Sequence, residues 1–250
     1  MTATEKKQFY GILKTVADWA YGCPAPGFSL HTPDFSNCAS SSEYSYGKTN
    51  TQSANVLESI AAKISTCTRC ELCKTRTNTV PGTGVAMPAV LVIGEGPGAD
   101  EDATGMPFVG KAGQLLDKML AAISLSRTSN CFIANIVKCR PPGNRDPFPE
   151  EIDACFSFLA AQTTALKPTM ILALGRVAVQ SLLRTSDGIG KLRGQFHDYN
   201  GIPLMATYHP SALLRNEDLK RPAWEDLKKF RDKLVQLTPG YNKPFDAERI

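Results

Sequence analysis

The stretch AVLVIGEGPG, residues 89–98, decides the fold class of this 250-residue chain. An uninterrupted apolar run enters a glycine-rich turn, as is typical of a strand that is buried on both faces and followed by a helix. The same order, an apolar run followed by a turn and a helix, recurs at 131–137 (CFIANIV) and at 170–174 (MILAL). We therefore expect an α/β fold, a three-layer α/β/α sandwich around a central, mainly parallel sheet. The expected helices cover 112–123, 150–165 and 177–183.

The rest of the chain extends this pattern in both directions. Residues 195–208 predict a hairpin that turns at Asn200-Gly201, and 222–237 predict a closing amphipathic helix. Residues 7–21 and 55–64 have helical spacing, whereas 22–53 are rich in Gly, Pro, Ser, Asn and Thr, as flexible linkers are. The expected division is an N-terminal helix and linker (1–54), one folded domain (55–240) and a short tail (241–250).

Composition places the chain among ordinary globular proteins, with 42% hydrophobic and 21% charged residues. Its longest apolar runs have about six residues, whereas a membrane span needs roughly twenty. The N-terminus, MTATEKKQFYG, has no apolar signal region. We expect a cytoplasmic monomer without a membrane partner. The net charge of +4 permits a polyanionic partner without requiring one.

Eight cysteines are spaced unevenly along the chain. Cys67, Cys70 and Cys73 crowd into seven residues, and Cys139 and Cys155 flank a proline-rich turn. In a chain without a secretory signal, such clustering favours a metal over disulfides. Thiolates from these two segments could hold either zinc or an iron–sulfur cluster, and their spacing leaves both open.

Polar residues follow the ends of three expected strands. Glu95, Asn135 and His209 would converge on one crevice, because ligands collect at the carboxyl edge of a parallel sheet. Each also has a purely structural interpretation. Asn135 could satisfy backbone groups, His209 could belong to a turn, and GEGPG could be a tight turn that binds phosphate. The P-loop pattern GxxxxGK[ST] is absent, so we do not expect a nucleoside triphosphate.

Four ordered motifs carry a resemblance to a known family. They are GEGPG at 94–98 followed by Glu101, GMPFVGKAG at 105–113, NIVKCRPP at 135–142 and HPS at 209–211. Together they resemble the family 4 uracil-DNA glycosylases, which are iron–sulfur enzymes of DNA repair. The resemblance covers roughly residues 67–234 and implies excision of uracil from single- or double-stranded DNA.

The resemblance implies roles for individual residues. A glycosylase flips the nucleotide into a pocket, where Phe108 would stack on uracil, Asn135 would pair with its N3/O4 edge, and His209 would stabilise charge on O2. Well-known uracil glycosylases carry a water-activating Asp where this chain has Gly96. The nearby carboxylates are Glu95 and Glu101, of which we prefer Glu101. The residues Glu95, Gly96 and Gly98 would form part of the substrate-binding loop.

The resemblance also implies a cofactor and a DNA contact. It makes Cys67, Cys70, Cys139 and Cys155 the ligands of a [4Fe–4S] cluster, with Cys73 as a spare residue. The loop after His209 would enter the minor groove through Ser211, Leu213 and Arg215. A structural interpretation instead places Leu213 and Leu214 in the core.

Two other functions compete with excision. The first is a catalytically silent nucleic-acid-binding module that keeps the fold and the cluster. The second is the related branch that is trapped covalently on the abasic product through a histidine. The segment NIVKCRPPGNRDPFP has neither the insertion nor the histidine of that branch.

Overall fold

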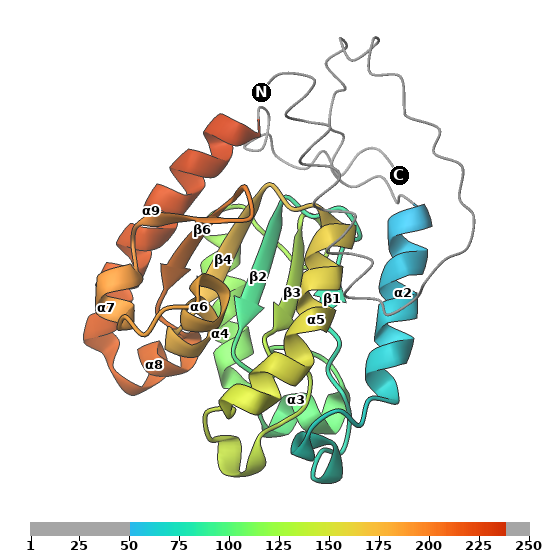
Figure 1. Ribbon diagram of the computed structural model, residues 1–250. Helices are drawn as coiled ribbons and strands as arrows, with labels where there is room; N and C mark the ends of the chain where they lie inside the picture. Colours follow the sequence, from blue (N-terminus) through green and yellow to red (C-terminus); the bar gives the residue numbers. More distant parts are fainter. Residues whose placement is uncertain (1–50, 239–250) are drawn as a thin grey trace, which may run out of the picture. The chain divides into compact units, whose positions relative to one another are not determined.

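The structure, a computed structural model, describes residues 51–238. A single mixed sheet crosses this part of the chain in the order β1-β3-β2-β4-β6-β5 (Figure 1). Its strands are β1 (Thr83–Gly84), β2 (Val90–Gly94), β3 (Cys131–Asn135), β4 (Met170–Leu174), β5 (Phe196–Tyr199) and β6 (Ile202–Thr207). β2, β3, β4 and β6 run parallel, and β1 and β5 are antiparallel edge strands. The expected mainly parallel sheet is confirmed.

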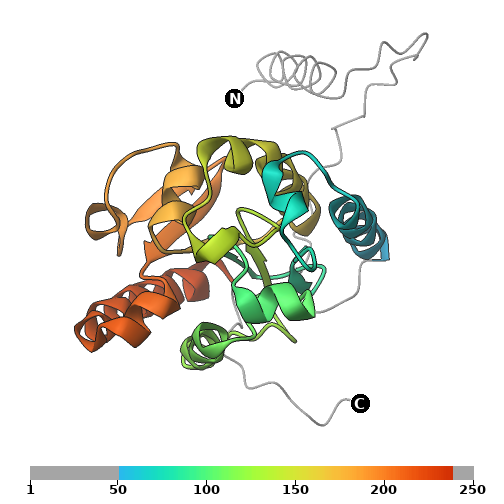
Figure 2. The same cartoon turned by 90° about the horizontal axis from the view of Figure 1, so that it is seen from below.

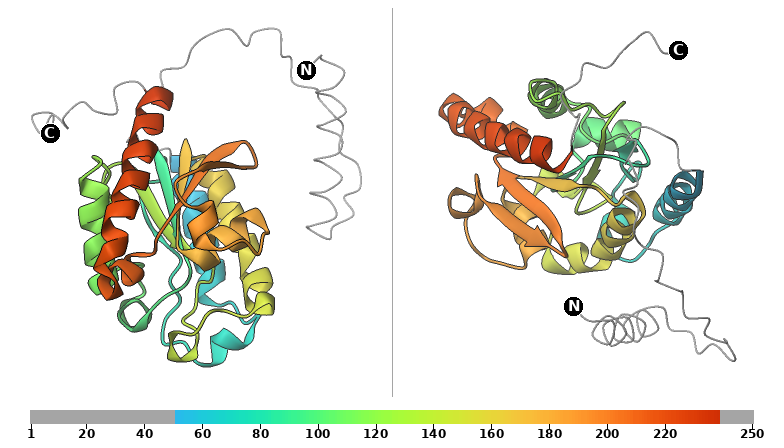
Figure 3. Two further views of the ribbon diagram at one scale, coloured as in Figure 1. Left: turned by 90° about the vertical axis from the view of Figure 1, so that its left-hand side faces the viewer. Right: turned by 90° about the horizontal axis from the view of Figure 1, so that it is seen from above.

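Helices cover both faces of this sheet. They are α2 (Thr51–Ser65), α3 (Ala99–Thr104), α4 (Lys111–Ala121), α5 (Pro149–Leu166), α6 (Arg176–Leu183), α7 (Ile189–Leu192), α8 (Pro210–Arg215) and α9 (Lys220–Leu237), with 3₁₀ turns at η1 (Glu71–Lys74), η2 (Pro142–Asn144) and η3 (Glu217–Leu219). α4 and α9 lie on one face, and α5 and α6 on the other (Figure 3).

Two hydrophobic cores result from the alternation of side chains along the central strands. Val90 and Val92 of β2 belong to the core that includes α4 and α9, whereas Leu91 and Ile93 belong to the core that includes α2 and α5. Successive strand residues point to opposite faces, so a strand covered on both sides must be apolar throughout. The continuous apolar runs in the sequence have this physical cause.

The register of the parallel strands gathers their carboxyl ends at one edge. Gly94 at the end of β2 pairs with Asn135 at the end of β3, and Leu174 of β4 pairs with Thr207 of β6. The loops that follow these residues lie together at the lower end of the ribbon in Figure 1, and Figure 2 views them from below. This edge is therefore where distant segments of the sequence meet.

Several boundaries differ from the sequence-based expectation. α2 covers Thr51–Ser65, so it includes the last residues of the predicted linker and is longer than the helix predicted at 55–64. The loop after β2 contains the unpredicted helix α3. The expected hairpin is present, with positive φ at both Asn200 and Gly201. The predicted helix at 7–21, most of the linker and the predicted tail at 241–250 lie outside the described residues.

No helix between residues 51 and 238 is both long and apolar enough to cross a membrane.

Candidate active site

A cavity of about 460 Å³ lies at the carboxyl edge of the sheet. The structure brings nine of the residues predicted for the site to its wall: Glu95, Gly96, Gly98, Glu101, Phe108, Asn135, His209, Ser211 and Arg215. They come from the loops after β2, β3 and β6, as the strand-end argument predicted.

Asn135 is nearly inaccessible to solvent, at 1% exposure, yet its side chain does not make all the hydrogen bonds it could. Within residues 51–238 its Oδ1 has no hydrogen-bond partner. A buried acceptor without a donor costs about 1–3 kcal/mol, so such atoms are rare and often functional. A Cβ on Gly94 would lie 2.4 Å from this Oδ1 and 2.6 Å from Cζ of Phe108. Glycine at position 94 therefore makes room for both side chains.

Phe108 is held beside Asn135 by an unusual backbone. Its φ is +54°, a left-handed conformation that side chains other than glycine rarely adopt and that concentrates at functional sites. Arg127 donates from Nη2 to the Phe108 carbonyl at 3.0 Å, and Asp117 pairs with Arg127 at 2.7 Å. A Cβ on Gly113 would come within 1.9 Å of that carbonyl oxygen. Arg127 and Gly113 thus fix the position of the ring.

Glu101 ties two loops together through backbone hydrogen bonds. Its Oε2 accepts from the Gly98 N–H at 3.0 Å, and its Oε1 accepts from Val109 at 2.9 Å and Gly110 at 3.1 Å. Both oxygens are therefore occupied in joining the GEGPG loop to the segment that carries Phe108. This arrangement suits a positioning residue and does not favour Glu101 as a water-activating base.

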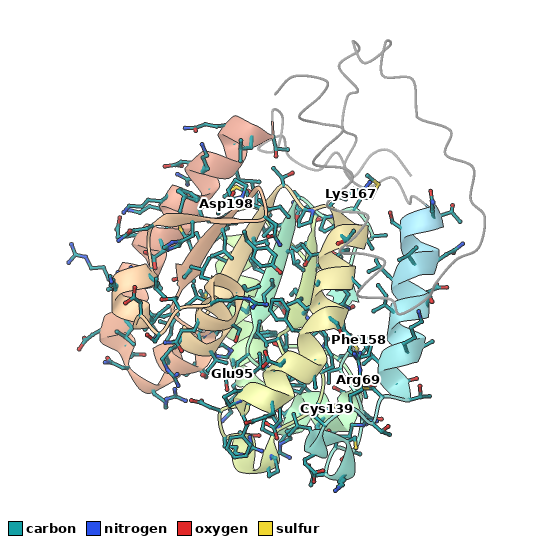
Figure 4. All side chains as sticks on the ribbon, in the orientation of Figure 1. Arg69, Glu95, Cys139, Phe158, Lys167 and Asp198 are labelled. Atoms are coloured by element: carbon teal, nitrogen blue, oxygen red, sulfur yellow. The ribbon has the colours of Figure 1, made fainter. Side chains whose placement is uncertain are left out.

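Glu95 is the carboxyl group better suited to that task. Burial and the neighbouring Asp146 raise the pKa of Glu95 to about 7, and Arg176 opposes this shift. Asp146 and Arg176 form an ion pair at the cavity wall. Figure 4 labels Glu95 at the lower end of the sheet. A carboxylate that titrates near neutral pH is suited to take a proton from water.

His209 has its two ring nitrogens in different roles. Nδ1 accepts from the Ser211 N–H at 3.2 Å, so the His209 side chain caps the N-terminus of α8. Nδ1 also lies 2.8 Å from Ser211 Oγ. Burial, and secondly Arg215, lowers the pKa of His209 to about 4, against a smaller effect of Glu101. The imidazole is therefore neutral at pH 7, with the proton on Nε2. Its ring lies 5.6 Å from that of Phe108.

The loop predicted to contact DNA lies partly in the core. Leu213 is 2% exposed and belongs to the core, because the first turn of α8 directs it inward, so the prediction that it contacts DNA is wrong. The adjacent Leu214 is 49% exposed. The sequence contains both leucines, and only the rotation of this six-residue helix decides which one faces solvent.

The cysteines predicted as metal ligands line a second, smaller cavity. Cys67, Cys70, Cys139 and Cys155 share it with Cys73, for which the resemblance implies no ligand role. None of the cysteines between residues 51 and 238 forms a disulfide. Figure 4 shows Cys139 near the lower ends of α2 and α5, close to the labelled Arg69 and Phe158.

The donor set at this cavity consists of soft sulfur ligands. Burial raises the pKa of Cys139 and raises that of Cys155 to about 11, so a metal must displace protons to bind. Arg76, which the sequence analysis missed, donates from Nη1 to Cys139 Sγ at 3.1 Å. In the described part of the chain, no three His, Cys, Asp or Glu side chains converge closely enough to hold a single metal ion. Five thiols line this cavity, and the four predicted ligands among them fit a polynuclear cluster in donor chemistry.

Lys138 connects the cysteine cavity to Asn135. Its side chain is fully buried, and Nζ donates to the Asn135 carbonyl at 2.9 Å and to Gln162 Oε1 at 2.7 Å. The backbone N–H of Lys138 donates to Cys155 Sγ at 3.3 Å. A lysine in a proline-rich turn gives no sequence signal for such burial, and it cannot contact a DNA phosphate from this position.

Comparisons with known proteins agree with this geometry. Residues 81–228 match the model of the uracil DNA glycosylase superfamily. The chain is 41% identical over 182 residues to a type-4 uracil-DNA glycosylase of Archaeoglobus fulgidus, covering 70% of this chain and 91% of that protein. It is 42% identical over 183 residues to the type-4 enzyme of Thermotoga maritima, with 70% and 93% covered. A type-5 uracil-DNA glycosylase of Pyrobaculum aerophilum is 33% identical over 150 residues, with 54% and 66% covered. The chain therefore belongs to the uracil-DNA glycosylase superfamily and, within it, to the type-4 enzymes.

Proposed function

We propose that this chain removes uracil from DNA by hydrolysing its N-glycosidic bond, with Asn135 selecting the base and His209 stabilising the leaving group. The observation that carries the proposal is the buried Oδ1 of Asn135, which has no hydrogen-bond partner within residues 51–238 and lies beside Phe108 in a cavity with room for a nucleobase. The edge of uracil offers an N3–H donor next to the O4 acceptor. A carboxamide presents the complementary acceptor and donor side by side.

The cavity can act on a base only after the nucleotide leaves the helical stack. Enzymes of this kind extrude the nucleotide and bind its base between apolar or aromatic groups. The Phe108 ring, fixed through its own backbone, would stack on the base and set its plane. A fixed plane would bring the N3 edge to Asn135 and the O2 edge toward His209.

His209 would act on the charge that develops as the bond breaks. The electron pair of the C1′–N1 bond passes to uracil, and negative charge accumulates on O2. Because Nδ1 accepts from Ser211, the donor directed at O2 is the Nε2–H of a neutral imidazole. Such a preorganised donor commonly contributes about 3 kcal/mol to the transition state.

Glu95 would supply the base for the attacking water. Water adds its oxygen to C1′, its proton passes to the Glu95 carboxylate, and uracil leaves as the anion. The products are uracil and an abasic site. Glu101 would hold the loop of Gly98 against the segment of Val109 and would not take a proton itself.

Cys67, Cys70, Cys139 and Cys155 would hold a [4Fe–4S] cluster, which would join the segment before β1 to the turn after β3 and to α5. When bound, the cluster supplies a covalent cross-link between these segments. Iron analysis and visible absorption of the purified protein test this assignment. Stoichiometric zinc without iron would overturn it.

A single-turnover assay tests the proposed function. Wild-type protein in excess over a uracil-containing oligonucleotide should release uracil and leave an alkali-labile site, whereas matched thymine and cytosine oligonucleotides should stay intact. Asn135→Ala should lose most of the excision. Tight binding of all three oligonucleotides without base release would instead identify a silent binding module.

A further inference from the structure

Phe148 is an exposed aromatic residue that the proposed chemistry does not use. Its side chain is 54% exposed, the largest value among the exposed large apolar residues of the described chain. It lies directly before α5, in the loop that follows β3. The start of α5 lies at the lower end of the ribbon, where the loops after the parallel strands gather (Figure 1). Leaving an apolar ring in contact with water forgoes the favourable free energy of burying it, so the exposed position suggests a role for the ring.

The ring is held in place by its neighbours. The Arg145 guanidinium carbon lies 3.7 Å from the ring centroid, covering one face. Glu151 fixes both residues, since it accepts two hydrogen bonds from Arg145, at 2.7 and 2.8 Å, and one from the Phe148 N–H at 2.8 Å. Proline on each side of Phe148 further restricts the backbone. The exposed ring is thus a rigid surface, with one face backed by a cation.

The loop that carries Phe148 borders the cavity for the base. Arg145 and Asp146 line that cavity. Asp146 and Arg176 also line a second, open groove of about 770 Å³, together with Pro147 and Pro149 on the two sides of Phe148. The cavity and the groove therefore adjoin along shared wall residues, and Phe148 lies within the segment that borders both.

We propose that Phe148, backed by Arg145, is a stacking platform for the nucleobase next to the flipped uracil in the same DNA strand. Extrusion of one nucleotide removes a stacking partner from each neighbour, and an aromatic ring beside the cavity replaces one of them. The positive charge of Arg145 behind the ring strengthens the contact between the ring and the base, because the base is attached to negatively charged phosphates. Every base has a π-face, so the platform binds without sequence preference. This proposal rests on the proposed function, because it assumes that uracil enters the cavity.

The experiment uses the full chain and a probe that binds without turnover. Oligonucleotides carry 2′-fluoro-deoxyuridine, whose glycosidic bond resists cleavage, with fluorescent 2-aminopurine placed in turn as the 5′ or 3′ neighbour. Dissociation constants and fluorescence are measured for wild type, Phe148→Ala, Phe148→Trp and Phe196→Ala. Phe196 is the matched control, since it is 41% exposed on the edge strand β5 and belongs to no loop of the cavity.

Phe148→Ala should bind about tenfold more weakly, within the range expected for loss of one stacked base. Its complex should also lose the fluorescence change of one of the two neighbours. Phe148→Trp should keep both properties, and Phe196→Ala should match wild type. Because position 148 is exposed, all variants should keep the melting temperature of the wild type.

The platform would be refuted if Phe148→Ala had the dissociation constant and the fluorescence of wild type. It would also be refuted if Phe196→Ala weakened binding as much as Phe148→Ala does. A parallel excision assay separates this failure from failure of the function. If wild type excises uracil and Phe148→Ala binds DNA as tightly as wild type, only the platform is refuted. Wild type that binds uracil DNA without excising it refutes the proposed function.

Discussion

The pH dependence of excision is the sharpest test of Glu95 as the base. Burial and Asp146 raise the pKa of Glu95 to about 7, and the base must be ionised to accept a proton from water. The single-turnover rate should therefore rise about tenfold per pH unit below 7 and level off above it. Glu95→Gln should lower the plateau at pH 8 by about a hundredfold or more, the usual contribution of a general base, and abolish the inflection near 7.

Asp146→Asn provides the matched control for this profile. Removing the Asp146 carboxylate takes away a charge that raises the pKa of Glu95, and it frees Arg176, which lowers it. The inflection should move to lower pH in this variant, with a similar plateau. Rates are measured at saturating enzyme between pH 5 and pH 9. An inflection near 7 that persists in Glu95→Gln, at a rate within a few-fold of wild type, would refute the assignment.

The raised pKa of Glu95 also affects the stability of the folded state. The folded-state pKa of Glu95 lies above the ordinary glutamate value of 4.5, so protonation stabilises the folded state. This stabilisation is complete below about pH 4.5 and is lost as the pH rises through 7. Glu95→Gln should therefore melt at a higher temperature than wild type at pH 8 and at a similar temperature near pH 4.5. A variant that loses activity while gaining stability cannot owe its defect to misfolding.

Three further predictions concern the other site residues. His209→Ala should lower the single-turnover rate about a hundredfold, the loss expected for one oxyanion donor, with DNA affinity changed little; a normal rate with weakened affinity would contradict the role of His209. Asn135→Ala should lower the rate and also reduce discrimination between uracil and cytosine oligonucleotides, and unchanged selectivity would argue against base reading. Cys139→Ala should lose iron and soluble yield in metal analysis, whereas Cys73→Ala should keep both, and the reverse pattern would replace Cys139 by Cys73 in the ligand set.

Much of the fold followed from the sequence because burial dictates composition. β2 and β4 are covered on both faces, so every residue must be apolar, and such runs are easily recognised. The convergence of Glu95, Asn135 and His209 followed from the parallel order alone, because parallel strands end at one edge. No knowledge of side-chain packing was needed for that step.

Residues whose role depends on side-chain direction could not be predicted in this way. Leu213 and Leu214 are equivalent in sequence, and the orientation of a short helix separates them. Glu101 lies only three residues after the glycine-rich loop that contains Glu95, so proximity in sequence does not exclude it as the catalytic carboxylate. Two of its three backbone donors, the N–H groups of Val109 and Gly110, reach it only when their segment folds back onto it.

The turn after β3 links the two cavities into one structural unit. Asn135 ends the strand, Cys139 follows four residues later, and the buried ammonium of Lys138 binds the Asn135 carbonyl while its backbone N–H binds Cys155 Sγ. A change in the cysteine segment would therefore reach the carbonyl of the base-reading residue through one lysine. Gln162, which accepts from Lys138 and donates to the Pro81 carbonyl at 2.7 Å, holds the same turn against α5. A cluster bound by Cys139 and Cys155 would fix this turn without touching the substrate, and the precision of Asn135 would depend on it. On this proposal, the metal site would act by fixing the turn and would take no part in bond cleavage.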